Sequence, residues 1–175
     1  MDSHFRPSLL KLSIQIKKLD RYTQWLERLV VGLLLLTIFN VFLDVVLRYA
    51  FNNSSIALQE MEWHLFSAMF LLGISYTLQK DAHVRVDVFY AKFSPQRQAL
   101  INLIGFAIFI LPISLLIAYD GIDFAYSAYA INEQSDAPGG LTHRFIIKSI
   151  IPISFILVII SGILFAKNNY EVLKQ

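Results

Sequence analysis

The sequence predicts an all-α membrane protein with four transmembrane helices and an N-terminal amphipathic interfacial helix. Of its 175 residues, 56% are hydrophobic and 16% are charged, whereas a soluble domain has about 25% charged residues. The mean hydropathy is +0.56. Four apolar runs are long enough to cross about 30 Å of hydrocarbon as helices. They are residues 29–47, 63–79, 99–119 and 146–166, of which the second is the shortest.

The distribution of basic residues predicts the orientation of these helices. Twelve of the fifteen Lys and Arg residues lie before the first run, between runs two and three, or after run four. Only Arg48, Arg144 and Lys148 lie toward the opposite side. By the positive-inside rule, both termini are therefore expected in the cytoplasm, with residues 167–175 as a short tail. The chain contains no cysteine, which excludes disulfides and thiolate metal sites.

Residues 1–28 are expected to lie on the cytoplasmic side of the membrane. Within residues 8–28, apolar side chains recur at steps of three and four residues, and most basic residues fall between them. This pattern predicts an amphipathic helix in the interface, with Trp25 at the depth of the lipid headgroups. The same residues could instead form an extension of the first transmembrane helix, and both interpretations stay open.

The connections carry recognisable turn and capping signals. Asn52-Asn53-Ser54 indicates a turn between the first two spans. In residues 80–94 the alternation of Val84, Val86 and Val88 favours a strand. An unpaired strand beside the bilayer would leave backbone groups without partners, so we favour a short cytoplasmic helix. Ser94 and Pro95 then fit the cap and first position of the third span.

The second half of the chain contains helix-breaking residues at defined places. Pro112 is expected to kink the third span. An apolar rhythm continues beyond residue 119, which predicts a periplasmic extension with an aromatic belt. Pro138-Gly139-Gly140 marks a break before the fourth span. Lys148 lies in the first turn of that span, where its side chain can extend outward to the interface.

Charged residues near the periplasmic side form two stripes. Asp44 and Arg48 share one face of the first span with Thr37 and Asn40. The second stripe lies on the second span and consists of Glu60, His64, Ser67, Ser75 and Gln79. The short connection predicts that Arg48 meets Glu60 at the surface, with Asp44 and His64 one turn deeper. Glu62 falls on another face and needs a different partner.

Three interpretations of this cluster remain open. The first is an ion pair between Asp44 and Arg48, with Glu60 alongside, that holds two helices in register. The second is docking, in which some of these charges meet another membrane subunit. The third is a proton or ion relay through Asp44 and His64. A relay should reach both sides of the membrane, but residues 29–36 contain no polar side chain, which disfavours it.

The remaining motifs argue against an enzyme or a complete transporter. Only His64 among four histidines lies within a span, and no metal, nucleotide or nucleophile motif is present, so no cofactor is expected. The discontinuous helices and inverted repeat of a complete secondary transporter are also missing. An accessory membrane subunit is therefore favoured. The alternative is a membrane-anchor subunit of a respiratory enzyme complex.

Residues 47–90 resemble the small membrane subunit, DctQ type, of tripartite ATP-independent periplasmic (TRAP) transporters. The shared features are Arg48-Tyr49-x-Phe51-Asn52, the acids Glu60 and Glu62, and His83-x-x-Val86-Asp87. Residues 138–155 also resemble the branch of the family with a longer loop. Many members have two adjacent acids, whereas Met61 separates them here. Thr142 stands where that branch has proline, which predicts a less rigid loop.

The resemblance implies a scaffold without catalytic or solute-binding residues, located in a bacterial inner membrane. A large membrane subunit (DctM type) would bind solute and sodium, and a periplasmic binding protein would deliver an organic acid. The expected partners are these two proteins and membrane lipids, and no nucleic acid is expected. Seven residues are candidates for helix pairing or subunit docking: Asp44, Arg48, Glu60, Glu62, His64, Arg85 and Asp87.

Overall fold

The computed structural model describes residues 6–80, 90 and 92–174, with side chains described from residue 21 onward. All long elements in this part of the chain are helices. They are α1 (Arg6–Ala50), α2 (Ile56–Gln79), α4 (Pro95–Gly105), η1 (Phe106–Ile110), α5 (Leu111–Ala130) and α6 (Phe145–Leu173). Because α4, η1 and α5 follow one another without a break, they form one long helical rod. The described residues therefore build four rods and contain no strand.

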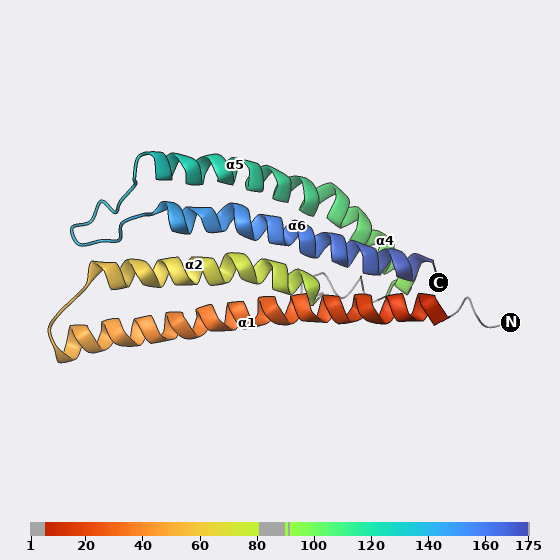
Figure 1. Cartoon of the computed structure of the whole chain (residues 1–175), viewed down its shortest axis with the longest axis horizontal. Helices are drawn as coiled ribbons and strands as arrows, with labels where there is room; N and C mark the ends of the chain where they lie inside the picture. Colours follow the sequence, from red (N-terminus) through yellow and green to blue (C-terminus); the bar gives the residue numbers. More distant parts are fainter. Residues whose placement is uncertain (1–5, 81–89, 91, 175) are drawn as a thin grey trace.

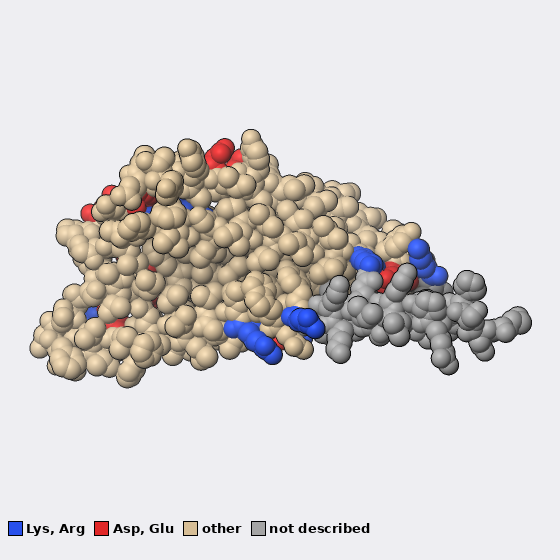
Figure 2. Space-filling view, viewed as in Figure 1, with Lys and Arg blue, Asp and Glu red and all other residues tan. Residues whose placement is uncertain are grey.

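The four rods lie roughly side by side along one axis (Figure 1). Helix α1 packs on α2, α2 packs on α6, and α6 packs on both α4 and α5. The beginning of α1 and the end of α6 lie at the same end of the bundle (Figure 1). We call the other end the loop end, because it carries residues 51–55 and 131–144. On the face drawn in Figure 2, most basic side chains lie toward the end with the termini.

Three of the rods are long and apolar enough to cross a membrane. The candidate spans are Arg21–Ala50, Pro95–Ala130 and Phe145–Leu173. Helix α2 forms as expected, but its crossing of the membrane over residues 63–79 stays a prediction. Helix α1 continues through residue 28 without a break. An interfacial position for residues 8–28 likewise stays a prediction.

The expected helix ends are largely present. The Ser94 hydroxyl accepts a hydrogen bond from the Arg97 amide at 3.4 Å, and Pro95 occupies the first turn of α4. Asn52 has a φ of 50°, consistent with the predicted turn. Ser55 caps α2 by accepting a hydrogen bond from the Leu58 amide. The predicted short helix in residues 80–94 falls mostly on 81–89 and 91, which lie outside the described residues.

The rod that contains Pro112 is irregular where the sequence predicts it. Proline has no amide hydrogen, so one carbonyl of the preceding turn loses its α-helical partner. The chain forms the π-helical turn η1 immediately before α5, and the Leu111 amide bonds to the Phe106 carbonyl. The rod curves over α4, η1 and α5 (Figure 1). It continues to Ala130, which confirms the helical extension, and α6 likewise continues through most of the expected tail.

Small residues line the contact between α5 and α6. On α5 the buried positions are Ser114, Ala118, Gly121, Ala125 and Ala128, spaced by three or four residues. On α6, Pro152 and Ile151 lie opposite Gly121, where a Cβ would be 3.1 Å and 3.4 Å from their side chains. Small side chains let helix backbones approach closely, which is how helices associate in lipid. Many large apolar side chains are exposed on the outside of the bundle, for example Trp63, Phe70 and Leu116.

Candidate functional site

Asp44 and Arg48 form an ion pair within α1. The Arg48 guanidinium donates to Oδ2 of Asp44, four residues earlier on the same helical face. Asp44 is buried, with 5% of its surface exposed, whereas the Arg48 side chain is 42% exposed. The other oxygen, Oδ1, accepts no hydrogen bond from the described residues. The ion pair of the first interpretation is therefore present, but it lies within α1 and does not include Glu60.

Asn40 helps to set the register of α1 relative to α2. Its side-chain amide donates to the Leu58 carbonyl at 2.8 Å, and Asn40 is buried. Thr37, on the same stripe, donates to the Leu33 carbonyl of its own helix instead. Among the described residues, the polar stripe of α1 therefore makes one hydrogen bond between helices, from Asn40, and two within α1, from Thr37 and Arg48.

Glu60 binds the loop between α5 and α6 and not Arg48. Its Oε1 accepts from the Ser135 hydroxyl, and its Oε2 accepts from the Leu141 amide at 2.7 Å. The sequence predicts that Arg48 meets Glu60, but both Glu60 oxygens are engaged by residues more than 70 positions later in the chain. Glu60 thus fastens the loop to the start of α2, while Arg48 pairs with Asp44.

The loop of residues 131–144 has a defined backbone. The Ser135 amide donates to the Leu141 carbonyl, and the Arg144 amide donates to the Glu133 carbonyl. Gly139 has a φ of +83°, which glycine adopts without steric cost. A Cβ at Gly140 would lie 2.4 Å from the Ser135 hydroxyl oxygen and 2.9 Å from Glu60 Oε2. Gly140 therefore lets the loop close on the Glu60 carboxylate.

Gly140→Ala is expected to detach the loop from Glu60. The added methyl group cannot occupy the same space as Ser135, so loop or carboxylate must move, at a cost of about 1 kcal/mol. Hydrogen exchange at the Leu141 amide should become faster. The matched control is Gly139→Asn, since asparagine also tolerates positive φ and a Cβ there meets nothing within 4 Å. Equal exchange rates in the two variants would contradict this role of Gly140.

The Glu60 contacts also predict a pH dependence. The hydrogen bond from Ser135 and then that from the Leu141 amide hold the pKa of the Glu60 carboxyl below its ordinary value of 4.5. A lowered pKa in the folded state means that the carboxylate stabilises the loop above 4.5. This stabilisation is lost as the pH falls through the lowered value. Leu141 amide protection, corrected for intrinsic exchange, should decrease as the pH falls below 4.5 and through the lowered pKa of Glu60.

Glu60→Gln provides the control for this titration. Glutamine can still accept a hydrogen bond but has no carboxylate, so its loop protection should not change over that pH range. Any pH dependence left in the variant belongs to groups other than Glu60. If the variant and the original chain lose protection in parallel, Glu60 is not the responsible group.

The Lys148 side chain is directed toward the loop. Its ammonium group pairs with Glu133 and lies 4.1 Å from the ring centroid of Phe124 on α5. The side chains of Lys148 and Glu133 are only 19% and 23% exposed. The sequence predicts that Lys148 extends toward the interface, and its side chain is directed to the loop at that end of the bundle, where Glu133 offers a carboxylate and Phe124 an aromatic face. This ion pair is a second attachment of the loop.

Ser75 and Gln79, the part of the α2 stripe near the C-terminal end of that helix, face α6 and not α1. The buried Ser75 hydroxyl donates to the Ser154 carbonyl at 3.4 Å, and the Gln79 amide donates to the Ser161 carbonyl at 2.7 Å. Tyr22 of α1 reaches the same region, 3.0 Å from the Ser161 hydroxyl. These polar groups therefore hold α2 and α1 to α6. The sequence indicates the polar stripe but not this partner.

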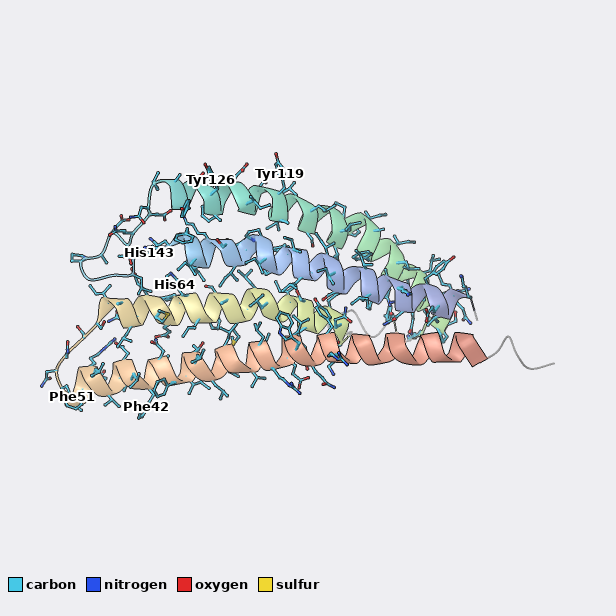
Figure 3. All side chains as sticks on the ribbon, in the orientation of Figure 1. Phe42, Phe51, His64, Tyr119, Tyr126 and His143 are labelled. Atoms are coloured by element: carbon cyan, nitrogen blue, oxygen red, sulfur yellow. The ribbon has the colours of Figure 1, made fainter. Side chains whose placement is uncertain are left out.

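The other candidate residues have different surroundings. His64 is half-buried and lines a groove together with His143 (Figure 3). Glu62 is half-buried and makes no hydrogen bond or ion pair with the described residues. Arg85 and Asp87 lie outside the described residues. In the part of the chain that the structure describes, no three acidic or histidine side chains could hold a metal ion together.

These features define a class of protein: a small helical membrane protein whose polar groups mostly hold its own helices and loop together. A model of the family "Tripartite ATP-independent periplasmic transporters, DctQ component" matches residues 37–170. The chain belongs to this DctQ family. It is also 32% identical over 142 residues to a protein of Haemophilus influenzae that is named a TRAP transporter small permease protein. The alignment covers 80% of this chain and 88% of that protein.

This assignment decides between the interpretations of the sequence. Members of the family are components of transporters and not enzymes, which favours the transporter subunit over the respiratory anchor. The seven candidate residues are not all used in the same way. Asp44, Arg48 and Glu60 have partners within the chain, whereas Glu62 has none among the described residues.

Proposed function

We propose that this chain is a scaffold for a large membrane subunit that translocates solute and sodium. The substrate would be an organic acid delivered by a periplasmic binding protein, and the assembly would lie in a bacterial inner membrane. Membership of the DctQ family carries this proposal. The internal contacts of two carboxylates support it, since Asp44 pairs with Arg48 and both oxygens of Glu60 bind the loop.

The proposed orientation has four crossings, with both termini in the cytoplasm. The three candidate spans and the antiparallel order of α1 and α2 support this arrangement. The fourth crossing would be α2, which is enclosed between α1 and α6 and buries Ala68, Leu72 and Leu78. The loop end, with the Glu60 contacts, would then face the periplasm. The excess of basic residues toward the other end agrees with the positive-inside rule.

Glu62 is the candidate that best fits a contact with the large subunit. It is half-buried without a partner among the described residues, and an unpaired carboxylate at the membrane surface gains from a cation on another protein. Trp63, next to it, is 71% exposed and offers an aromatic contact on the same helix. Arg85 and Asp87 stay candidates for docking on the cytoplasmic side.

Co-purification tests the scaffold role. A tagged chain, solubilised from membranes of its native host in a mild detergent, is expected to bring down one large multi-spanning membrane protein. Glu62→Gln should reduce the recovered amount about tenfold if an ion pair of about 1.4 kcal/mol is lost. Glu171→Gln, at the terminal end of α6, is the matched control and should have no effect. Recovery of no large membrane protein would contradict the scaffold role, whereas an unaffected Glu62→Gln would remove only Glu62 from the interface.

A further inference from the structure

A groove of about 250 Å³ lies between α1, α2 and α6 near the loop end. Helix α2 forms its base with Met61, His64, Leu65 and Ala68. The other walls come from Leu33 of α1, from Leu141 to His143 of the loop, and from Ile146, Ile147 and Ile150 of α6. Figure 3 shows His64 on α2 and His143 just before α6, both at this end of the bundle. The groove therefore lies between α1 and α6 at the loop end, whereas Tyr22 connects these two helices directly near the termini.

The groove is lined almost wholly by apolar atoms, and its polar side chains are His64, Thr142 and His143. Thr142 and His143 belong to the loop, whereas Ala68 and Ile150 line the part further from the loop. From Met61 to Ala68 it follows α2 for about 10 Å, at 1.5 Å per residue. A bilayer changes in the same direction, from headgroups to hydrocarbon. This matches an amphiphile whose chain points toward the membrane centre.

A half-buried cation, Arg144, follows His143 at the loop end of the groove. Arg144 is half-buried, and its guanidinium group makes no ion pair or side-chain hydrogen bond with the described residues. It is close enough to Glu60 and His64 to act on both electrostatically. However, Ser135 and Leu141 already occupy the Glu60 oxygens. The Arg144 guanidinium therefore keeps donors that no acceptor in the described residues uses, and guanidinium binds phosphate with two parallel hydrogen bonds.

We propose that this groove binds one membrane phospholipid, with an acyl chain against Leu65, Ala68 and Ile150 and the phosphate beside His143 and Arg144. An apolar cavity of about 150 Å³ is enough for benzene, so about 250 Å³ accommodates a segment of an acyl chain. The bound lipid would contact both α1 and α6 near the loop end, where these two helices make few direct contacts with each other. The proposal requires only that the chain lies in a membrane, so it can fail independently of the scaffold role.

Photo-crosslinking tests the binding of the acyl chain. The full chain is reconstituted in vesicles that contain phosphatidylethanolamine with a diazirine on one acyl chain, and cross-linked peptides are mapped by mass spectrometry. Cross-links should concentrate on residues 61–68 and 146–150. Leu65→Phe, which fills the groove, should reduce them roughly tenfold, as expected for a loss of about 1.4 kcal/mol. Ile122→Phe is the matched control on the outer face of α5 and should leave them unchanged. Thr142→Phe, at the mouth of the groove, replaces Leu65→Phe if the latter does not fold.

Native mass spectrometry tests the binding of the phosphate headgroup by Arg144. Arg144→Gln should reduce the fraction of chain that retains a phospholipid by several-fold. Arg97→Gln, in α4 at the end of the bundle that carries the termini, should not reduce it. Cross-links spread evenly over the outer face of α5 would mean ordinary surrounding lipid and overturn the proposal. Cross-linking that disappears from the groove when a co-purified membrane protein or a second copy of the chain is present would also overturn it, since a protein would then fill this space. If neither Leu65→Phe nor Thr142→Phe reduces cross-linking in the groove, the proposal is also overturned.

Discussion

Gly162→Ala is expected to destabilise the chain by about 1–3 kcal/mol, the usual cost of adding a methyl group to a packed interior. Gly162 lies on the buried face of α6, and the ring of Phe106 occupies the space where a Cβ would be. That Cβ would lie 2.1 Å from Cε2 and 2.8 Å from Cδ2 of Phe106. Phe106 is itself only 8% exposed and begins the π-helical turn, so its ring has little room to move away. The loss of stability should be visible as a lower midpoint of thermal unfolding in detergent.

A series of glycine-to-alanine variants gives this prediction an internal control. A Cβ at Gly73 meets no atom within 4 Å, so Gly73→Ala should raise stability by about 0.5–1 kcal/mol through helix propensity. A Cβ at Gly121 would lie 3.1 Å from the ring of Pro152, which predicts an effect between the other two. Phe106→Leu should restore part of the stability of Gly162→Ala. If Gly162→Ala is as stable as Gly73→Ala, the contact between Phe106 and Gly162 does not hold α4 and η1 to α6.

Elements of the fold that depend on local chemistry could be predicted from the sequence. The apolar runs indicate long helices because their backbone can satisfy its hydrogen bonds internally. Ser94 and Pro95 indicate a helix start, and the residues of the Pro138-Gly139-Gly140 turn indicate a break, because each acts on the backbone beside it. Pro112 indicates an irregularity for the same reason. In each case the deciding interaction lies within a few residues of the signal.

The partners of the polar residues could not be predicted as well. Asp44 and Arg48 are four residues apart on one helix, so their pairing follows from helical geometry. Glu60 could reach either Arg48 or a loop that comes more than 70 residues later, and the sequence does not contain the conformation that brings Leu141 to it. Ser75 and Gln79 bind backbone carbonyls of α6, which every residue possesses. A partner of this kind leaves no signal in the residue types.

Removal of the Arg48 side chain is expected to destabilise the chain about as much as Gly162→Ala. Arg48→Ala would leave the carboxylate of Asp44, 5% exposed, without its counterion and without a hydrogen bond to Oδ2. Breaking a fully buried ion pair by removing one partner costs about 3–5 kcal/mol. Because the Arg48 side chain is 42% exposed and partly solvated, we expect about 2 kcal/mol. The readout is the free energy of unfolding in mixed micelles.

Neutralising both groups separates the stranded charge from other effects of the substitution. In Arg48→Ala with Asp44→Asn no carboxylate remains, so this double variant should be more stable than Arg48→Ala alone. Exchanging the two residues is a poorer test, because the longer arginine side chain would not fit the buried position of Asp44. Arg97→Ala, in a helix near the other end of the bundle, controls for the loss of a basic residue and should cost less than about 0.5 kcal/mol. If Arg48→Ala behaves like Arg97→Ala, or if Asp44→Asn gives no recovery, the charge on Asp44 is balanced by something other than Arg48.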